Sequence, residues 1–338
     1  MNGKDTDALK CGLLGRRLGH SFSPEIHGML ASYRYDLYER EPGELPAFFS
    51  ESGLRGLNVT IPYKKDVIPF LKDLSPEAEQ IGAVNTVVFD DDGMHGYNTD
   101  AYGFEKLLLS SGCDIAGKKV LILGSGGASA AVRYVLNLHH ADSIVISRTG
   151  KNNYSNLSQH YDAELIVNTT PVGMFPDLDG SPVGLAPFRS LKAVIDLIYN
   201  PLNTSLMLDA RELGIGAFNG MTMLVYQAKR AAELFLRTSI DDAEAERIIS
   251  LITESKSNLI VFKDRAGSGI QELSYMTGRE TVDLTKGLPP LKELTALCGR
   301  PGSVMITNED IMDDRRVKRL IMHNGVIVSG ENAGGMLK

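Results

Sequence analysis

The chain has 338 residues, of which 43% are hydrophobic and 23% charged, as in an ordinary globular protein. Its net charge of −7 argues against a nucleic-acid-binding protein, which would need a basic face. The first ten residues are polar and no run of about 18 apolar residues occurs, so we expect neither a signal peptide nor a transmembrane helix.

The three cysteines, Cys11, Cys113 and Cys298, are far apart, odd in number and without a C-x-x-C pair. This pattern argues against both a zinc site and a disulfide framework. We therefore expect reduced thiols, no bound metal and a cytoplasmic location.

Residues 11–104 alternate short apolar runs with helical stretches. The apolar runs Cys11–Leu14, Leu57–Thr60 and Ala83–Phe89 predict buried strands, and Pro24–Ala31 predicts a helix. This rhythm indicates an α/β layer with a largely buried sheet.

A second group of strands begins at Val120–Leu123, which ends at a glycine turn and leads into a predicted helix over Ala128–His139. Three further apolar runs predict strands at Ser143–Ile146, Leu165–Val167 and Ala193–Ile198. This order is typical of a small doubly wound nucleotide-binding domain. The connection between Arg148 and Asn168 is short, so we expect one helix or strand there to be reduced.

Two helices follow these strands. Apolar residues at helical spacing predict a helix over Met221–Arg237. Ser239–Asp242 resembles a capping box that opens a second helix, which we expect to run to about Glu254. Both helices are expected to complete the first α/β layer.

The turn Gly124-Ser125-Gly126-Gly127 stands between a predicted strand and a predicted helix. Glycines there allow a tight turn and let the backbone approach phosphates without a Cβ in the way. We assign these four residues and Ala128 to binding a dinucleotide pyrophosphate at the helix N-terminus. The sixth position of G-x-G-x-x-G is Ser129, so the motif alone also fits an ordinary structural turn.

The end of the next strand bears on the choice of cofactor. NAD-binding units carry Asp or Glu about 20 residues beyond the glycine turn, where it binds the ribose 2′-hydroxyl. Here the chain reads Ser147-Arg148-Thr149, with Lys151 close behind. Because the guanidinium fork matches phosphate oxygens, this segment favours the 2′-phosphate of NADP. A solvated surface arginine is the alternative.

Seven short motifs occur in one order between residues 10 and 250. They are Gly19–Pro24, Gly56–Lys64, Gly82–Thr86, Asn98–Asp100, Asn168–Met174, Asp196–Pro201 and Met223–Gln227. In sequence and order they resemble the motifs of the shikimate dehydrogenase family. Seven motifs in one order are far more specific than the glycine turn alone.

The resemblance implies an NADPH-dependent, reversible reduction of 3-dehydroshikimate to shikimate, on the route to chorismate and the aromatic amino acids. It implies that Lys64 donates a proton to the forming alkoxide and that Asp100 holds and tunes Lys64. The cofactor would supply the hydride. Without the motif, Lys64 and Lys65 would be interpreted as a solvated surface pair.

The same resemblance assigns polar residues to a polyol substrate. Ser21 and Ser23 stand at a predicted helix start, where two hydroxyls and free N–H groups can bind a carboxylate. An N-cap serine is the alternative, and it does not exclude that role. The remaining assignments are Thr60, Asn85, Tyr199 and Gln227 for the substrate, and Leu197 and Gly220 for the nicotinamide.

Residues 255–338 extend beyond this resemblance. Asn258–Phe262 predicts a strand, and Arg265–Gly269 follows it as a glycine-containing turn. With Thr277–Leu284 and Asn324–Val328, these fragments resemble parts of shikimate kinase.

The lysine and hydroxyl of a P-loop are missing from this region. Ile270 and Gln271 occupy their places, so neither the nucleotide phosphates nor Mg²⁺ would be held. We interpret the region as a degenerate, truncated kinase remnant; an unrelated small appendage is the alternative.

The predicted fold class is α/β, in three parts. Residues 1–104, completed by the helices over 221–254, form a substrate-binding domain. Residues 105–220 form a Rossmann-like NADP-binding domain, and residues 255–338 form the kinase-like remnant. We expect a monomer or homodimer that binds a small-molecule substrate and neither nucleic acid nor membrane.

Two other functions compete with this prediction. The first is a quinate/shikimate dehydrogenase that uses NAD, against which Arg148 argues. The second is a non-catalytic binding protein on the same fold, against which Lys64 and Asp100 argue.

Overall fold

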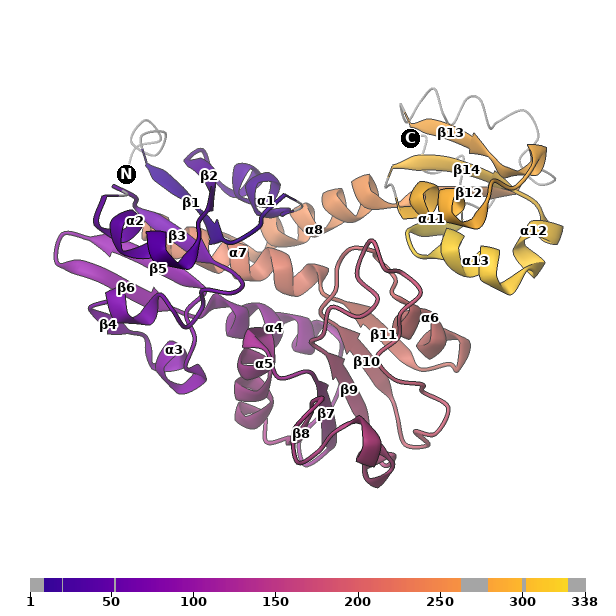
Figure 1. Cartoon of the computed structure of the whole chain (residues 1–338), viewed down its shortest axis with the longest axis horizontal. Coiled ribbons are helices and arrows are strands. Elements are labelled where there is room, and N and C mark those ends of the chain that lie inside the picture. Colours follow the sequence, from indigo (N-terminus) through magenta and orange to yellow (C-terminus); the bar gives the residue numbers. More distant parts are fainter. Residues whose placement is uncertain (1–8, 20, 52, 263–278, 300–301, 328–338) are drawn as a thin grey trace. The chain divides into compact units, whose positions relative to one another are not determined.

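The computed structural model describes residues 9–19, 21–51, 53–262, 279–299 and 302–327 (Figure 1). The chain divides into two compact units. The first unit comprises Met1–Thr169 and Thr222–Ile249, and the second comprises Thr170–Met221 and Ser250–Lys338.

A six-stranded mixed sheet, ordered β2-β1-β3-β5-β6-β4, forms one layer of the first unit. Its strands are β1 (Lys10–Gly15), β2 (Arg34–Glu39), β3 (Gly56–Val59), β4 (Asp73–Leu74), β5 (Thr86–Asp90) and β6 (Gly93–Tyr97). Strand β1 pairs in parallel with β2 and β3, whereas β5 runs antiparallel to β3 and β6. All four residues of β3 are buried, as expected for a central strand of apolar character.

Helices surround this sheet and connect its strands. They are α1 (Ser23–Leu30), α2 (Leu45–Glu51), α3 (Pro76–Ile81), α4 (Thr99–Ser110), α7 (Met221–Leu236) and α8 (Asp242–Lys256), with 3-10 turns η1 (Pro42–Glu44) and η2 (Ile68–Phe70). Figure 1 shows α7 running along the sheet. A Cβ on Gly56 of β3 would stand 2.1 Å from the Phe235 ring of α7, so glycine is what allows this close packing.

A parallel β-α-β arrangement follows in the first unit. Strand β7 (Lys119–Leu123) lies between β8 (Asp142–Ile146) and β9 (Leu165–Asn168), and α5 (Gly127–Leu138) connects β7 to β8. The connection from β8 to β9 holds only the 3-10 segment η3 (Tyr154–His160). This agrees with the reduction expected from its short length.

The second unit begins with the parallel strands β10 (Ala193–Asp196) and β11 (Gly216–Asn219), joined by α6 (Ser205–Glu212). Helix α6 starts at an N-cap, Thr204, whose hydroxyl accepts from Met207 N.

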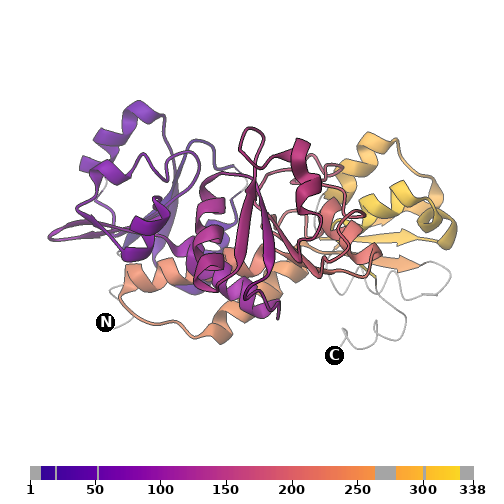
Figure 2. The same ribbon diagram turned by 90° about the horizontal axis from the view of Figure 1, so that it is seen from below.

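A four-stranded parallel sheet, ordered β13-β14-β12-β15, completes the second unit. Its elements are β12 (Asn258–Phe262), β13 (Glu280–Asp283), η4 (Leu284–Lys286), α11 (Leu291–Gly299), β14 (Ser303–Thr307), α12 (Glu309–Asp313), α13 (Arg315–Met322) and β15 (Gly325–Ile327). Figure 2 shows the helices gathered on one face of this sheet, where Leu294, Leu320 and Ile321 are buried against Met305 and Ile260.

The α/β fold class is confirmed. The elements that the sequence predicted are β1, β3, β5, β7, β8, β9, β10, β12, α1, α5, α7 and α8, whereas the remaining strands and helices were not predicted. One expected strand is shorter, because Ala83–Asn85 lie outside it: Val84 N bonds to Lys64 O and Ala83 O accepts from the Asn98 side chain. At the start of α8 it is Asp241, rather than Ser239, whose side chain accepts from Ala243 N.

Among the described residues, no helix has both the length and the apolar character needed to cross a membrane. The predicted glycine turn Arg265–Gly269, with Ile270, Gln271, Thr277, Gly278 and Val328, lies outside the described residues.

Candidate active site

Lys64 and Asp100 form an ion pair in the first unit. Lys64 Nζ lies 2.5 Å from Asp100 Oδ2, and the two side chains are 16% and 10% exposed. Lys64 follows β3, and Asp100 is the second residue of α4. A partly buried lysine–carboxylate pair is the arrangement that the sequence predicted for proton donation.

The turn that carries Lys64 is held on several sides. Thr60 N bonds to Leu14 O at 2.9 Å, which extends the β1–β3 pairing past the end of β3. Tyr63 is fully buried, and its hydroxyl donates to Arg40 O. Val84 N donates to Lys64 O at 2.7 Å. These bonds fix the backbone at Lys64, from which the side chain extends to Asp100.

Asp100 owes its position to the start of α4. Asn98 is the N-cap, and its Oδ1 accepts from Ala101 N at 3.3 Å while its Nδ2 donates to Ala83 O at 2.9 Å. The partial positive charge of a helix N-terminus stabilises a carboxylate in the first turn.

Asn85 fixes the other oxygen of Asp100. Its Nδ2 donates to Asp100 Oδ1 at 2.9 Å, and its Oδ1 accepts from Thr99 N at 2.7 Å. The residue is 3% exposed. Each Asp100 oxygen thus has a donor, one from Lys64 and one from Asn85, as a buried carboxylate requires.

The hydrogen-bond network continues through residues that the sequence analysis did not single out. Thr86 Oγ1 lies 3.1 Å from Thr99 Oγ1 and accepts from Asn58 Nδ2 at 3.1 Å. Asn58 Oδ1 in turn accepts from the Tyr35 hydroxyl at 2.8 Å. Asn58, Thr86 and Thr99 all lie within the quoted motifs. The signal that could have found Asn58 and Thr86 is a polar side chain among otherwise apolar, buried strand residues, whereas Thr99 opens helix α4.

Lys64 lies against the glycine turn. A Cβ on Gly127 would stand 3.4 Å from Lys64 Cδ, so Lys64 and the start of α5 are neighbours. Gly126 is the N-cap of α5 without a side-chain cap bond, and Gly124 has a left-handed φ of 103°. Ser125 and Gly126 are exposed and Ala128 half-buried, so the free N–H groups at this helix start can take an anion.

Ser129, the departure from the glycine fingerprint, is 3% exposed and lies on the inner side of α5. It therefore replaces a packing glycine and leaves the phosphate-facing turn unchanged.

Arg148 is exposed at the end of β8, where a tight turn presents it. Ser147 Oγ accepts from Gly150 N at 2.9 Å, and Ser147 N donates to Asn152 O at 3.2 Å. Thr149 is also exposed. The hydroxyl of Ser147 is thus used locally, whereas Arg148 and Thr149 point to solvent, as a phosphate site requires.

Four other predicted substrate residues belong to the same unit. Ser21 Oγ accepts from Ser23 N at 3.2 Å at the start of α1, and Ser23 is 9% exposed. The Thr60 methyl packs against Gly15, where a Cβ would stand 2.8 Å from it. Gln227 on α7 donates to Leu224 O at 2.9 Å and faces Gly103 of α4.

Three predicted residues lie in the second unit. Gly220 N bonds to Ile198 O at 3.1 Å, and a Cβ on Gly220 would stand 2.0 Å from Leu197 O, so only glycine fits there. Burial raises the pKa of the Tyr199 phenol, which keeps it a neutral hydrogen-bonding group.

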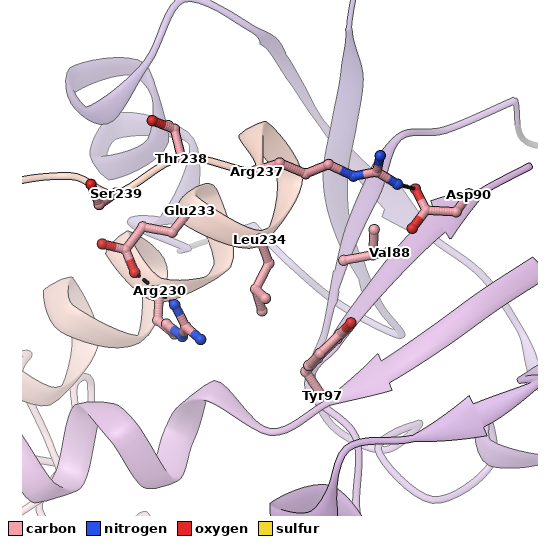
Figure 3. Close-up of a pocket in the computed structure, with 9 residues that line it drawn as sticks. All are labelled: Val88, Asp90, Tyr97, Arg230, Glu233, Leu234, Arg237, Thr238 and Ser239. Atoms are coloured by element: carbon pink, nitrogen blue, oxygen red, sulfur yellow. Dashed lines mark hydrogen bonds and ion pairs between the residues drawn. The ribbon is translucent and has the colours of Figure 1, made fainter.

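A cavity of about 430 Å³ lies elsewhere in the first unit (Figure 3). Its walls come from β5, β6 and the end of α7, and Asp90–Arg237 and Glu233–Arg230 ion pairs close its polar side. None of the predicted site residues lines it.

Together, the β-α-β unit with its glycine turn and the adjacent Lys64–Asp100 pair are the features of a dinucleotide-binding α/β protein with a partly buried lysine–carboxylate pair beside the turn. Residues 13–87 match the model of the shikimate dehydrogenase substrate binding domain. A shikimate dehydrogenase (NADP(+)) from Clostridium perfringens is 34% identical over 259 residues, which are 70% of this chain and 96% of the relative.

Solved structures agree with this match. A chorismate mutase/shikimate 5-dehydrogenase fusion protein from Clostridium acetobutylicum has a TM-score of 0.69 at 35% identity, and covers 73% of this chain and 97% of its own. Shikimate 5-dehydrogenase from Thermus thermophilus, in complex with NADP(H) and shikimate, has a TM-score of 0.64 at 31% identity, covering 72% and 99%. The chain belongs to the shikimate dehydrogenase family.

Proposed function

We propose that this chain catalyses the NADPH-dependent, reversible reduction of 3-dehydroshikimate to shikimate. The observation that carries the proposal is the Lys64–Asp100 pair lying beside Gly127 at the start of α5. That contact brings a proton donor to the end of the molecule's glycine turn, where a dinucleotide would bind.

NADPH, when bound, supplies hydride to the substrate carbonyl carbon. Lys64 donates the proton to the carbonyl oxygen, and in the reverse direction it accepts that proton from the hydroxyl. Asp100 holds Lys64 Nζ toward the reacting oxygen and keeps its charge compensated while Asn85 fixes Asp100. These residues orient and protonate, so their effect is on turnover.

The remaining substrate residues bind the ring. Ser21 and Ser23, with the start of α1, bind the carboxylate. Thr60 and Gln227 pair with ring hydroxyls, Asn85 borders the ring and acts through Asp100, whose carboxylate it holds, and Tyr199 borders the substrate. A polyol needs such partners, because an unpaired polar group in a closed site is costly.

The cofactor assignments follow the geometry of the turns. Gly124–Ala128 hold the pyrophosphate at the start of α5, and Ser147, Arg148 and Thr149 surround the 2′-phosphate. Leu197 and Gly220 border the nicotinamide. The exposed position of Arg148 at the end of β8 supports NADP over NAD.

The three-part domain division and the origin of residues 255–338 as a kinase remnant are also proposals. What supports the remnant is its parallel sheet, in which β12 lies between β14 and β15. Strand β12 thus stands where the strand order switches, and the residues that follow it contain the predicted glycine turn. Arg279, from the kinase-like motif, bonds to the carbonyls of Ser257 and Glu254, a structural use.

The monomer or homodimer state and the cytoplasmic location stay predictions. The free thiols of Cys11, Cys113 and Cys298 fit a reducing compartment.

The test is cofactor oxidation with 3-dehydroshikimate, together with the reverse reaction on shikimate and on quinate, each with both nicotinamide cofactors. Preferred use of NADPH with 3-dehydroshikimate supports the proposal. Preferred use of NAD with quinate would favour a quinate/shikimate dehydrogenase, and no reaction in any combination would favour a binding protein.

A further inference from the structure

Residues beyond 255 contact the segment that carries Leu197 and Tyr199. All of these contacts lie within the second unit. Leu202 N donates to Asn324 Oδ1 at 2.9 Å, and Asn203 N donates to His323 O at 2.8 Å. In return, Asn203 Nδ2 donates to Met322 O at 3.0 Å, and Asn203 O lies 2.6 Å from His323 Nδ1.

These bonds are directional, and His323 and Asn324 are buried on their side of the contact. His323 is fully buried and Asn324 is 2% exposed. A carbonyl can only accept, so His323 must carry its proton on Nδ1. Burial lowers the pKa of this imidazole, which keeps the ring neutral in that donor form.

Asn324 is anchored on its other side by the C-terminal sheet. Its Nδ2 donates to Cys298 O at 3.2 Å, and its carbonyl accepts from Asn258 N at 2.6 Å, at the start of β12. Asn258 Oδ1 accepts from Ser303 N at 3.0 Å. The contact to Leu202 is therefore backed by two strands.

Hydrogen bonds also connect the segment around Leu202 and Asn203 to residues beside Leu197 and Gly220, the predicted nicotinamide neighbours. Asn219 Nδ2 donates to Leu202 O at 3.0 Å, and Thr204 Oγ1 donates to Asp196 Oδ2 at 2.7 Å. Asp196 Oδ1 accepts from Ile198 N at 3.1 Å. A shift of Leu202 and Asn203 would be transmitted to Leu197 and Gly220 through these few bonds.

We propose that His323 and Asn324 are positioning residues for the reaction: the C-terminal region holds the Asp196–Asn203 segment, and with it Leu197 and Tyr199, in the geometry needed for hydride transfer. This inference rests on the proposed function for its catalytic consequence. The contact of His323 and Asn324 with Leu202 and Asn203 belongs to the fold, and its strength can be measured by hydrogen exchange without any substrate.

The test compares full-length variants. His323→Leu removes the donor to Asn203 O, His323→Asn keeps a donor near the Nδ1 position, and Arg315→Ala removes only an exposed ion pair to Glu212 of the same contact surface. If His323→Leu fails to fold, Asn203→Ala removes the bond to Met322 O from the opposite side. Three readouts are taken: amide hydrogen exchange at Leu202 and Asn203, kcat/KM for 3-dehydroshikimate with NADPH, and the Kd of adenosine 2′,5′-bisphosphate.

We expect faster exchange at Leu202 and Asn203 in His323→Leu and a loss of about tenfold or more in kcat/KM, because small misplacements at a reacting centre are costly. The bisphosphate Kd should not change, since that fragment lacks the nicotinamide. His323→Asn should recover most of the loss, and Arg315→Ala should match the wild type.

If hydrogen exchange at Leu202 and Asn203 and kcat/KM in His323→Leu equal those of the wild type, the proposal is overturned. An equal loss in bisphosphate affinity would also overturn it, because that pattern indicates general unfolding. If the wild type lacks reductase activity altogether, the proposed function fails. The contact of His323 and Asn324 with Leu202 and Asn203 is then tested by hydrogen exchange alone, and unchanged exchange in His323→Leu would reject it.

Discussion

The Lys64–Asp100 network and the His323–Asn324 contact are both polar and at least partly buried, yet they are encoded differently. In the first, side chains bond to side chains: Lys64, Asp100, Asn85 and Thr99 satisfy one another. In the second, three of the four bonds to Leu202 and Asn203 use a backbone carbonyl or N–H on one side and a side chain on the other. Side-chain networks constrain residue types and so leave motifs in the sequence, whereas contacts to backbone groups leave little trace.

The two regions should also differ in what their loss removes. Breaking the first network removes chemistry, whereas breaking the second loosens the segment on which predicted site residues stand. Substitutions in each region, ordered from the largest expected effect to the smallest, can separate these effects.

The largest expected effect is at Lys64. Lys64→Ala should lower kcat about 10²–10⁴-fold with a smaller change in substrate binding, because it removes general acid catalysis. The measurement is steady-state NADPH oxidation with 3-dehydroshikimate. Lys65→Ala is the matched control, since Lys65 is adjacent and exposed and should behave as the wild type. A well-folded Lys64→Ala protein with near-normal kcat would remove Lys64 from its role.

Arg148 should show the next largest effect. A charge-assisted hydrogen bond to phosphate contributes about 1.5–3 kcal/mol, so Arg148→Ala should weaken NADPH roughly 10- to 100-fold and leave NADH nearly unchanged. The comparison is KM for both cofactors, with Lys151→Ala as the control for loss of a nearby positive charge. Equal losses for NADPH and NADH would show that Arg148 is structural.

A smaller effect is expected from pH, through His27 in the first unit. Burial lowers the pKa of this ring to about 3 from a usual value of 6.5. Below pH 6.5 the unfolded chain therefore binds a proton that the folded chain excludes, and stability falls as the pH falls toward 3.

The matched variant is His27→Gln, which keeps a side-chain amide for the Tyr33 hydroxyl that now lies 2.5 Å from His27 Nδ1. Between pH 7 and 5 the wild type should lose roughly 2 kcal/mol more unfolding free energy than this variant. Chemical denaturation at both pH values gives the difference. Identical losses in the two proteins would mean that His27 does not titrate with folding.

The sequence motifs could point to the candidate site in the first unit because the proposed chemistry restricts residue types. Lys64, Asp100 and Asn85 were placed in motifs, and the structure brings them together with Gly127. Asn58, Thr86 and Thr99 were missed because a buried amide or hydroxyl, on a strand or at a helix start, is informative only once its neighbours in space are known.

Strands were predicted where short apolar runs stood out from polar neighbours, as in β7, which a glycine turn follows. The strand over β5 was expected to begin at Ala83, but Ala83 and Val84 are apolar for a different reason: they are fully buried in a connecting turn that bonds to Lys64 and Asn98. The docking of His323 and Asn324 could not be predicted, since neither residue type nor spacing specifies a backbone partner 120 positions away.

We propose that the reductase chemistry lies in residues 10–250, the part that resembles the family, and that the C-terminal region performs no phosphoryl transfer of its own. One measurement tests it directly: the full chain is incubated with shikimate, NADP⁺, ATP and Mg²⁺, and NADPH formation and ADP release are followed in the same mixture. We expect NADPH to accumulate while ADP stays at background. Shikimate-dependent ADP release, or the absence of NADPH, would contradict it.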